Sequence, residues 1–238
     1  MESDPTLFAV VLLSGAASFF VSASAGMGGS LVLVPVLALS LGTKEGIALA
    51  ALLLAGNNVF KVLAYRKTLP FKTASLVILL TLVGAYVGAH ALVVVPDIYI
   101  GIAVVIALVS TFVLERRKYS LRAGSPALAL ASGITSGVSG TSGPLKAIAL
   151  RSLGLSRDYL VGAACLVSLA GDAIKTVVFV DAELLGTQAW TMGAASIPVM
   201  CGSTFAGRQF NRAIGERGYG RLFWAVMGGY AIRLIVSV

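Results

Sequence analysis

The sequence is poor in charged residues and in cysteine. Only 12% of its 238 residues are charged, 58% are hydrophobic, and the mean hydropathy is +0.94. A soluble domain cannot bury so much apolar surface, so a soluble protein is excluded. The two cysteines, Cys165 and Cys201, lie in apolar segments without the spacing of a metal site or a disulfide framework. We expect both to be small buried side chains, and we expect no metal or cofactor.

Charge is almost absent from seven segments of about 17–24 residues. A helix needs about 20 such residues to cross a bilayer. The segments do not alternate between polar and apolar residues, which excludes a β-barrel. The composition therefore predicts an all-α polytopic membrane protein. The acidic start, MESDP, argues against a cleaved signal peptide. The apolar segments are residues 7–24, 46–64, 73–95, 98–114, 159–180, 184–207 and 222–238.

The net charge of +8 is concentrated in a few loops. Loops 66–72, 115–122, 151–158 and 208–221 hold 13 of the 18 lysines and arginines. Cytoplasmic loops of membrane proteins carry such an excess of basic residues. We therefore expect these loops to be cytoplasmic, both termini to be outside, and no nucleic acid to be bound.

Two stretches fit a simple crossing badly. By the charge rule, residues 7–42 start and end outside, whereas residues 123–154 start and end inside. Glycines at 26, 28 and 29 interrupt the first stretch, and "GITSGVSGTSGP" (133–144) interrupts the second. The second arm of the first stretch, about 30–41, is only roughly 18 Å long as a helix. We expect two re-entrant hairpins; two full crossings by 123–154 remain the alternative.

The chain then reads as two inverted repeats. Residues 1–118 hold a hairpin and three crossings, and residues 119–238 hold the same elements with the opposite orientation. "AGNNVFK" (55–61) and "AGDAIK" (170–175) fall in the first crossing after each hairpin. Inverted repeats with broken helices are typical of transporters. The expected elements are hairpin 7–42 with helices 46–65, 73–95 and 98–114, then hairpin 123–154 with helices 159–180, 184–207 and 222–238.

The two breaks predict an anion site. Irregular backbone at membrane depth must line a cavity or be buried in protein. Each break precedes a short helix, near Ser30 and near Pro144, and the free N–H groups of a helix start attract anions. We expect the breaks to meet near the bilayer midplane and to bind an anion between them. The alternative is that glycine and serine only permit close helix packing.

The candidate site residues come from the breaks and from the crossing that follows each break. Lys61 and Lys175 occupy matched places, where they either attract an anion or snorkel to the headgroups. Asp172 either carries a coupling proton or neutralises Lys175. Lys146 either faces the site or reaches the cytoplasmic side. The expected substrate-binding residues are Gly26, Gly28, Gly29, Ser30, Asn57, Asn58, Lys61, Ser136, Gly137, Ser139, Gly140, Thr141, Ser142, Gly143 and Lys175.

Both glycine-rich motifs resemble those of one family. "GMGGSLVLVP" (26–35) is similar to the first-repeat motif of the TauE/SafE sulfite exporter family, also called the toluene-sulfonate uptake permease family. "GITSGVSGTSGP" (133–144) resembles the second-repeat motif, and the resemblance covers nearly the whole chain. It implies transport of sulfite, sulfonates or related sulfur oxyanions across a bacterial-type inner membrane. Members differ in substrate and direction, so import and other small anions stay open.

Other functions are weighed against this one. "GVSG" (137–140) matches the nucleophile setting of rhomboid intramembrane proteases, and such a serine needs a base. The only histidine, His90, precedes the serine, whereas the rhomboid base follows it, so an enzyme is disfavoured. A non-transporting membrane scaffold would not need paired internal breaks. The sequence leaves a homodimer open.

Overall fold

The computed structural model describes residues 5–96, 99–100, 125–141, 143–214, 218 and 221. In these ranges the secondary structure is helical, with no strand. The predicted crossing 222–238 lies outside the described residues, as does 98–114 except for residues 99–100. Four of the described helices are long and apolar enough to cross a membrane, which agrees with the predicted all-α membrane fold.

The first hairpin breaks where the glycines predict. Helix α1 (Pro5–Ala25) ends just before the break, and α2 (Gly29–Leu41) begins directly after Gly28. Gly28 has φ +99°, a left-handed conformation that glycine adopts without steric cost. Gly42, with φ +98°, alone separates α2 from α3 (Thr43–Ala64). The 13 residues of α2 span only about 20 Å.

The second hairpin has the same plan. Between α3 and this hairpin, the described residues include the 3-10 turn η1 (Arg66–Thr68) and helix α4 (Phe71–Val94). The hairpin consists of α6 (Ser125–Ser139) and α7 (Gly143–Arg151), joined through Gly140 with φ +70°. The long helix α8 (Arg157–Asp181) follows it, as α3 follows the first hairpin.

The predicted single helix over 184–207 is wrong. The chain forms α9 (Thr187–Ala195) and then α10 (Ile197–Ala213), with Ser196 between them. Pro198 lies in the first turn of α10, where its missing N–H is tolerated, whereas a continuous helix would need that donor. Helix α10 also extends into the predicted loop 208–221.

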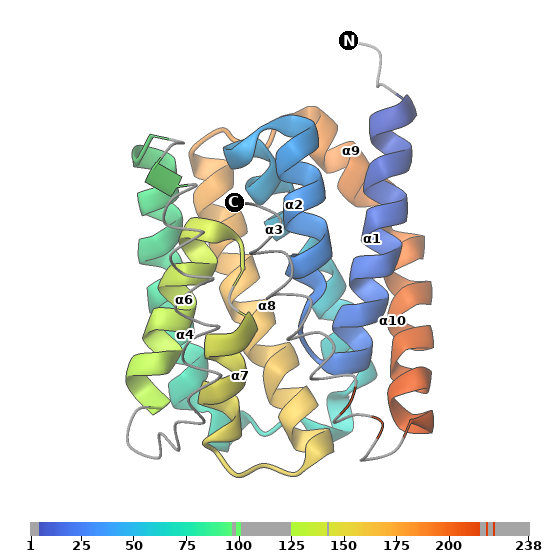
Figure 1. Ribbon diagram of the computed structural model, residues 1–238, viewed down its shortest axis with the longest axis vertical. Coiled ribbons are helices and arrows are strands. Elements are labelled where there is room, and N and C mark those ends of the chain that lie inside the picture. The colour runs from blue at the N-terminus through green and yellow to red at the C-terminus, as the bar shows by residue number, and fades with distance from the viewer. Residues whose placement is uncertain are drawn as a thin grey trace.

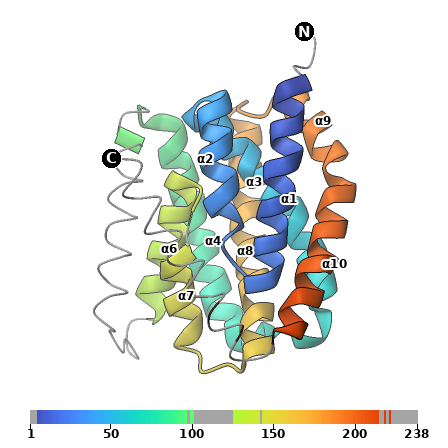
Figure 2. The ribbon, with the colours of Figure 1, turned by 45° about the vertical axis from the view of Figure 1, so that its right-hand side comes forward.

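The two hairpins enter the molecule from opposite ends and pass each other (Figures 1 and 2). Gly26, at the first break, lies against Val161 of α8, and Gly140, at the second, lies against Ile47 of α3. Val161 and Ile47 are each about 6 Å from the start of their helix. The sequence predicted that the two breaks meet near the middle, and in this respect the structure differs. The tip of each hairpin reaches past the middle of the molecule, so the hairpins overlap.

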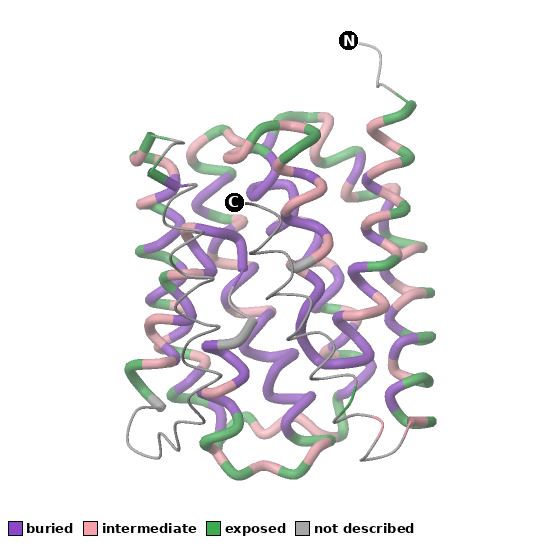
Figure 3. Tube along the Cα trace, in the orientation of Figure 1, coloured by how far each residue is buried: buried purple, intermediate pink, exposed green. Residues whose placement is uncertain are grey.

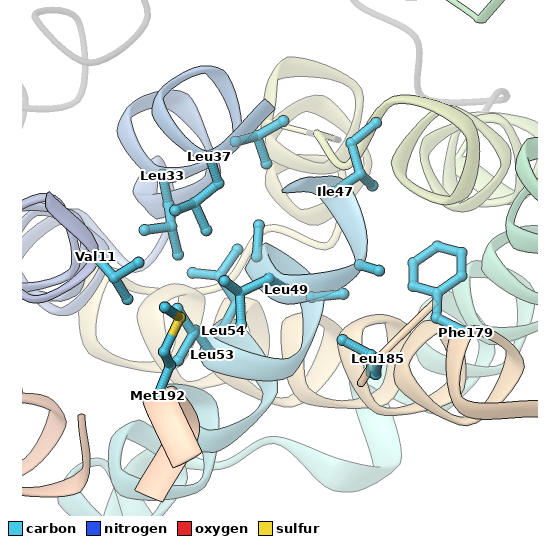
Figure 4. Packing of buried hydrophobic residues seen from close by; sticks show 14 of the residues in the cluster. Val11, Leu33, Leu37, Ile47, Leu49, Leu53, Leu54, Phe179, Leu185 and Met192 are labelled. Atoms are coloured by element: carbon cyan, nitrogen blue, oxygen red, sulfur yellow. The ribbon is translucent and has the colours of Figure 1, made fainter. Parts of the chain in front are cut away.

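Helices α3 and α8 form the centre of the bundle. In the most apolar 18-residue stretch of each of these helices, 61% of the residues are buried, compared with 33% in α1 and 39% in α4 (Figure 3). Apolar side chains such as Leu33, Ile47, Leu53 and Phe179 pack between α2, α3 and α8 (Figure 4). The outer helices pack closely through small residues: Gly84 and Gly88 of α4 face glycines of α6, which lets the two backbones touch.

Charge separates between the two ends of the molecule. The basic end holds η1, the α7–α8 connection and the end of α10 (Figure 1). The opposite end carries Glu45, Asp181 and Glu183 together with Lys44, whose Nζ donates to the carbonyl of Val93. The described basic residues at this end include Arg66, Lys67, Lys72, Arg151, Arg157, Arg208 and Arg212.

Candidate functional site

Two lysines are completely buried at matched places in α3 and α8. Lys61 and Lys175 both have 0% exposure, so neither snorkels to the surface. The Nζ of Lys61 donates to Ser22 Oγ of α1 at 2.8 Å, and the Nζ of Lys175 donates to Ser136 Oγ of α6 at 3.0 Å. Each ammonium group thus binds the first arm of the hairpin that precedes its own helix. In both pairs the serine lies 39 residues before the lysine.

Contacts recur at an offset of 114 residues. This offset relates the two serine–lysine pairs, and it relates Gly26 to Gly140, whose φ angles are +79° and +70°. It also separates Asn58 from Asp172, and these two residues bind each other: Asn58 Nδ2 donates to Asp172 Oδ2 at 2.7 Å. The equivalent positions of α3 and α8 therefore meet at the centre of the bundle.

Asp172 and Asn58 join both lysines into one network. Asp172 Oδ1 lies 2.6 Å from the Nζ of Lys175, and Asn58 Oδ1 accepts a hydrogen bond from Lys61 at 2.9 Å. The order is Lys61, Asn58, Asp172, Lys175, across the α3–α8 contact. Buried polar groups are costly unless they are paired, and each of these four has a partner.

A third buried lysine completes the group. Lys146 of α7 is 8% exposed, and its Nζ donates to Ser168 Oγ of α8 at 2.8 Å. The sequence left open whether Lys146 faces the site or reaches the cytoplasmic side. The structure places it in the interior. We call Lys61, Lys146, Lys175 and Asp172 the buried lysine cluster. In the part of the chain that the structure describes, Asp172 is the only buried carboxylate, so lysines outnumber carboxylates three to one.

A small cavity of about 20 Å³ adjoins the cluster. A cavity of this size has room for about one water molecule, so an oxyanion needs the surrounding helices to move apart. The walls come from the first break, the start of α2, and helices α1, α3, α6, α7 and α8. The lining residues are Ser22, Met27, Gly28, Gly29, Ser30, Leu54, Asn58, Ser136, Gly140, Lys146, Ser168 and Asp172.

Nine of the fifteen predicted binding residues lie at this cavity or directly behind it. Lys61 and Lys175 lie behind the wall, and the carbonyl of Gly26 is 3.4 Å from the Nζ of Lys61. Those in the wall are Gly28, Gly29, Ser30, Asn58, Ser136 and Gly140.

The remaining predicted residues lie elsewhere. Asn57 faces α10, where its Oδ1 accepts a hydrogen bond from Thr204 at 2.8 Å. A Cβ on Gly137 would lie 2.5 Å from the Ala89 nitrogen of α4, so this glycine serves helix packing. Gly143 begins α7, Ser142 lies outside the described residues, and the hydroxyl groups of Ser139 and Thr141 are 3.2 Å apart.

Sequence reasoning missed Ser22, Met27, Leu54 and Ser168. A signal for Ser22 existed, because it lies four residues before Gly26 as Ser136 lies four residues before Gly140. Nothing in the sequence marks Ser168, an isolated serine in an apolar helix.

The whole chain can now be compared with known proteins. A family model described as sulfite exporter TauE/SafE matches residues 10–234. The chain belongs to the TauE/SafE sulfite exporter family. Membership identifies this TauE/SafE protein as a multi-pass membrane transporter of sulfite or related anions, and the resemblance of its two glycine-rich motifs is confirmed. No curated protein and no solved structure shows significant similarity to it.

The groups that suggested a protease have other partners. Ser139 Oγ donates to the carbonyl of Thr135 at 2.7 Å. His90 lies exposed on α4, where its Nδ1 is 3.0 Å from the carbonyl of Tyr86. Both contacts are local, and TauE/SafE is a family of transporters.

Proposed function

We propose that this TauE/SafE protein exports a small sulfur oxyanion, sulfite or an organosulfonate, from the cytoplasm across a bacterial-type inner membrane. The observation that carries the proposal is the charge of the buried lysine cluster. Among the residues that the structure describes, three buried lysines share the interior with one buried carboxylate, Asp172. Excess positive charge in a low-dielectric interior is costly, and a bound anion offsets that cost.

The anion binds in the cavity beside the cluster. Gly28, Gly29 and Ser30 bring the start of α2 to the cavity wall, where backbone N–H groups favour an anion. Ser136 and Gly140 contribute the wall from the second hairpin. Because the cavity is small, binding is coupled to a movement of the hairpins.

Transport uses two inverted repeats, residues 1–118 and 119–238. The offset of 114 residues between matched contacts supports this division. Two re-entrant hairpins that enter from opposite ends give the cavity a possible route to each side of the membrane, which is the requirement for alternating access. The basic end faces the cytoplasm, and the end with Glu45, Asp181 and Glu183 faces outward, in agreement with the positive-inside rule.

Export is the direction that the membrane potential favours. Moving one negative charge outward gains about 2.3 kcal/mol per 100 mV when the inside is negative. A carrier without a coupling ion therefore exports a monovalent anion. In this scheme Asp172 is a structural counter-ion; as the alternative, it carries a coupling proton.

Proteoliposomes test the function directly. Vesicles are loaded with radiolabelled sulfite, with an organosulfonate or with sulfate, and a potassium gradient with valinomycin sets the potential. We expect faster efflux of sulfite or sulfonate when the inside is negative, and little effect in vesicles without protein. Transport that needs a pH gradient would indicate proton coupling, and efflux of none of these anions would overturn the proposal.

A further inference from the structure

We infer that the transported anion makes its direct charged contact with Lys146, whereas Lys61 and Lys175 act from behind the site as positioning residues. The inference rests on the proposed function and assigns different roles to the three lysines of the buried lysine cluster. It follows from counting the hydrogen-bond partners of each ammonium group, which has three N–H donors.

Lys61 has protein partners for all three donors. Its Nζ contacts Ser22 Oγ at 2.8 Å, Asn58 Oδ1 at 2.9 Å and, more distantly, the Gly26 carbonyl at 3.4 Å. The side chain is 0% exposed and does not form part of the cavity wall. To bind an anion directly, Lys61 would have to give up contacts that fix the first hairpin to α3.

Lys175 is neutralised by an ion pair. Its Nζ lies 2.6 Å from Asp172 Oδ1 and 3.0 Å from Ser136 Oγ. It is also 0% exposed and absent from the cavity wall. An anion that approached Lys175 would compete with a carboxylate already in contact.

Lys146 differs from both in two respects. Its side chain forms part of the cavity wall, and its Nζ has a single partner among the described residues, Ser168 Oγ at 2.8 Å. Two N–H donors therefore remain for a ligand, and no carboxylate lies in contact with them. An oxyanion accepts such charge-assisted hydrogen bonds through two of its oxygens.

A second element in the wall of the cavity completes a clamp. The first residues of α2 line the same cavity, and α2 is a 13-residue helix whose start carries a partial positive charge. Helix α2 belongs to the first hairpin and Lys146 to the second. An anion held between them binds both hairpins at once, so it couples binding to the relative position of the hairpins.

The test compares the three lysines by substitution with methionine, which keeps the length of the side chain and removes the charge. Lys67→Met, at an exposed position in η1, is the matched control. Sulfite binding to detergent-purified protein and the KM and kcat of transport are measured for each variant. Loss of two charged hydrogen bonds should weaken sulfite binding by about 10- to 100-fold in Lys146→Met.

The other variants should give a different pattern. We expect Lys61→Met and Lys175→Met to lower the unfolding midpoint without ligand while the folded fraction keeps its sulfite affinity within about fivefold. Lys146→Met removes a buried charge without breaking an ion pair, so it should fold. Lys146→Arg keeps the charge and should bind sulfite more tightly than Lys146→Met.

The outcomes separate this inference from the proposed function. If wild-type protein transports none of the tested anions, the proposed function fails. If wild-type protein transports sulfite and Lys146→Met binds it within twofold of wild type, the assignment of Lys146 is overturned and the function stands. If Lys146→Met does not fold, sulfite binding by Lys146→Gln decides under the same criterion.

Discussion

Replacing Asp172 with asparagine tests the charge balance of the buried lysine cluster. Asparagine has nearly the same shape as aspartate. Its side-chain oxygen can still accept the hydrogen bond from Asn58, which is 2.7 Å long in the wild-type protein. The substitution therefore removes one negative charge and, because asparagine has a single side-chain oxygen, also the acceptor that faces Lys175. That charge is 2.6 Å from the Nζ of Lys175, which is fully buried. After the change, three ammonium groups share the interior without a described carboxylate among them.

The expected loss of stability is large. Removing one partner of a buried ion pair costs about 3–5 kcal/mol, because the other charge is left uncompensated. Lys175→Gln should cost less, because Asp172 keeps the hydrogen bond from Asn58 and the attraction of the two other lysines. The double variant should recover most of the loss, since both members of the pair are gone.

Unfolding free energies are measured in mixed micelles with increasing dodecyl sulfate, in gluconate buffer so that chloride does not occupy the cluster. Sulfite is then added. A ligand at 100 times its Kd stabilises the folded state by about 2.7 kcal/mol. Because Asp172→Asn removes the negative charge that opposes an anion, sulfite should stabilise this variant more than wild type.

Two results would refute this reasoning. One is an Asp172→Asn variant as stable as wild type, and the other is a variant that sulfite stabilises less than wild type. Transport by the double variant then separates the two roles of Asp172. Recovered transport indicates a structural counter-ion, whereas a stable protein that binds sulfite and does not move it indicates proton coupling.

Three further predictions follow from the fold. Gly140→Ala should slow transport and cost about 1–2 kcal/mol, because φ is +70° and the added Cβ would lie 3.0 Å from a Val34 methyl group; Gly202→Ala, with open space around it, is the control. Gly137→Ala should reduce the yield of folded protein instead, since its Cβ would strike the α4 backbone, and size-exclusion chromatography measures that yield. In a cysteine-free background, cysteine at Lys72 should react with an impermeant reagent from the cytoplasmic side and cysteine at Glu183 from outside; reaction of both from one side contradicts the topology.

The sequence was sufficient to predict the two helix breaks and the three long helices α3, α4 and α8. Glycine runs placed the two breaks where α1 and α6 end, because few other residues adopt the left-handed backbone there. The predicted helix 46–65 differs from α3 (Thr43–Ala64) by three residues at its start and one at its end. The predicted helix 159–180 differs from α8 (Arg157–Asp181) by two residues at its start and one at its end. The helix breaks and the bounds of these helices depend on local sequence, so hydropathy and glycine spacing are enough to predict them.

The parts that the sequence predicted wrongly or left open depend on local exceptions or on tertiary contacts. Pro198 marked the α9–α10 break, yet the apolar run around it outweighed that signal. The orientation of Lys146 depends on how α7 crosses α8, which no pattern within α7 encodes. The same limit hid the overlap of the hairpins, since the contacts of Gly26 and Gly140 are with distant helices.

The contacts that recur at the 114-residue offset distinguish residues of the framework from residues that determine specificity. At the 114-residue offset, the serine–lysine pair is the same in both halves, which suits a structural role that each hairpin needs. Asn58 and Asp172 are similar in shape but differ in charge, so this pair keeps the contact between α3 and α8 and adds one negative charge.

Lys146 and Ser168 break the symmetry completely. Their equivalents at the same offset are Val32 and Leu54, which cannot offer a charge or a hydrogen bond. Leu54 and Ser168 both line the cavity, so one half of its wall is apolar where the other is polar. A symmetric site would present two such lysines and would suit two anions or one with charge at both ends. Lys146 and the start of α2 both lie in the wall of this cavity, together with Leu54. We therefore propose that it binds a single small anion with its charge at one end, and that the apolar part of an organosulfonate would lie toward Leu54.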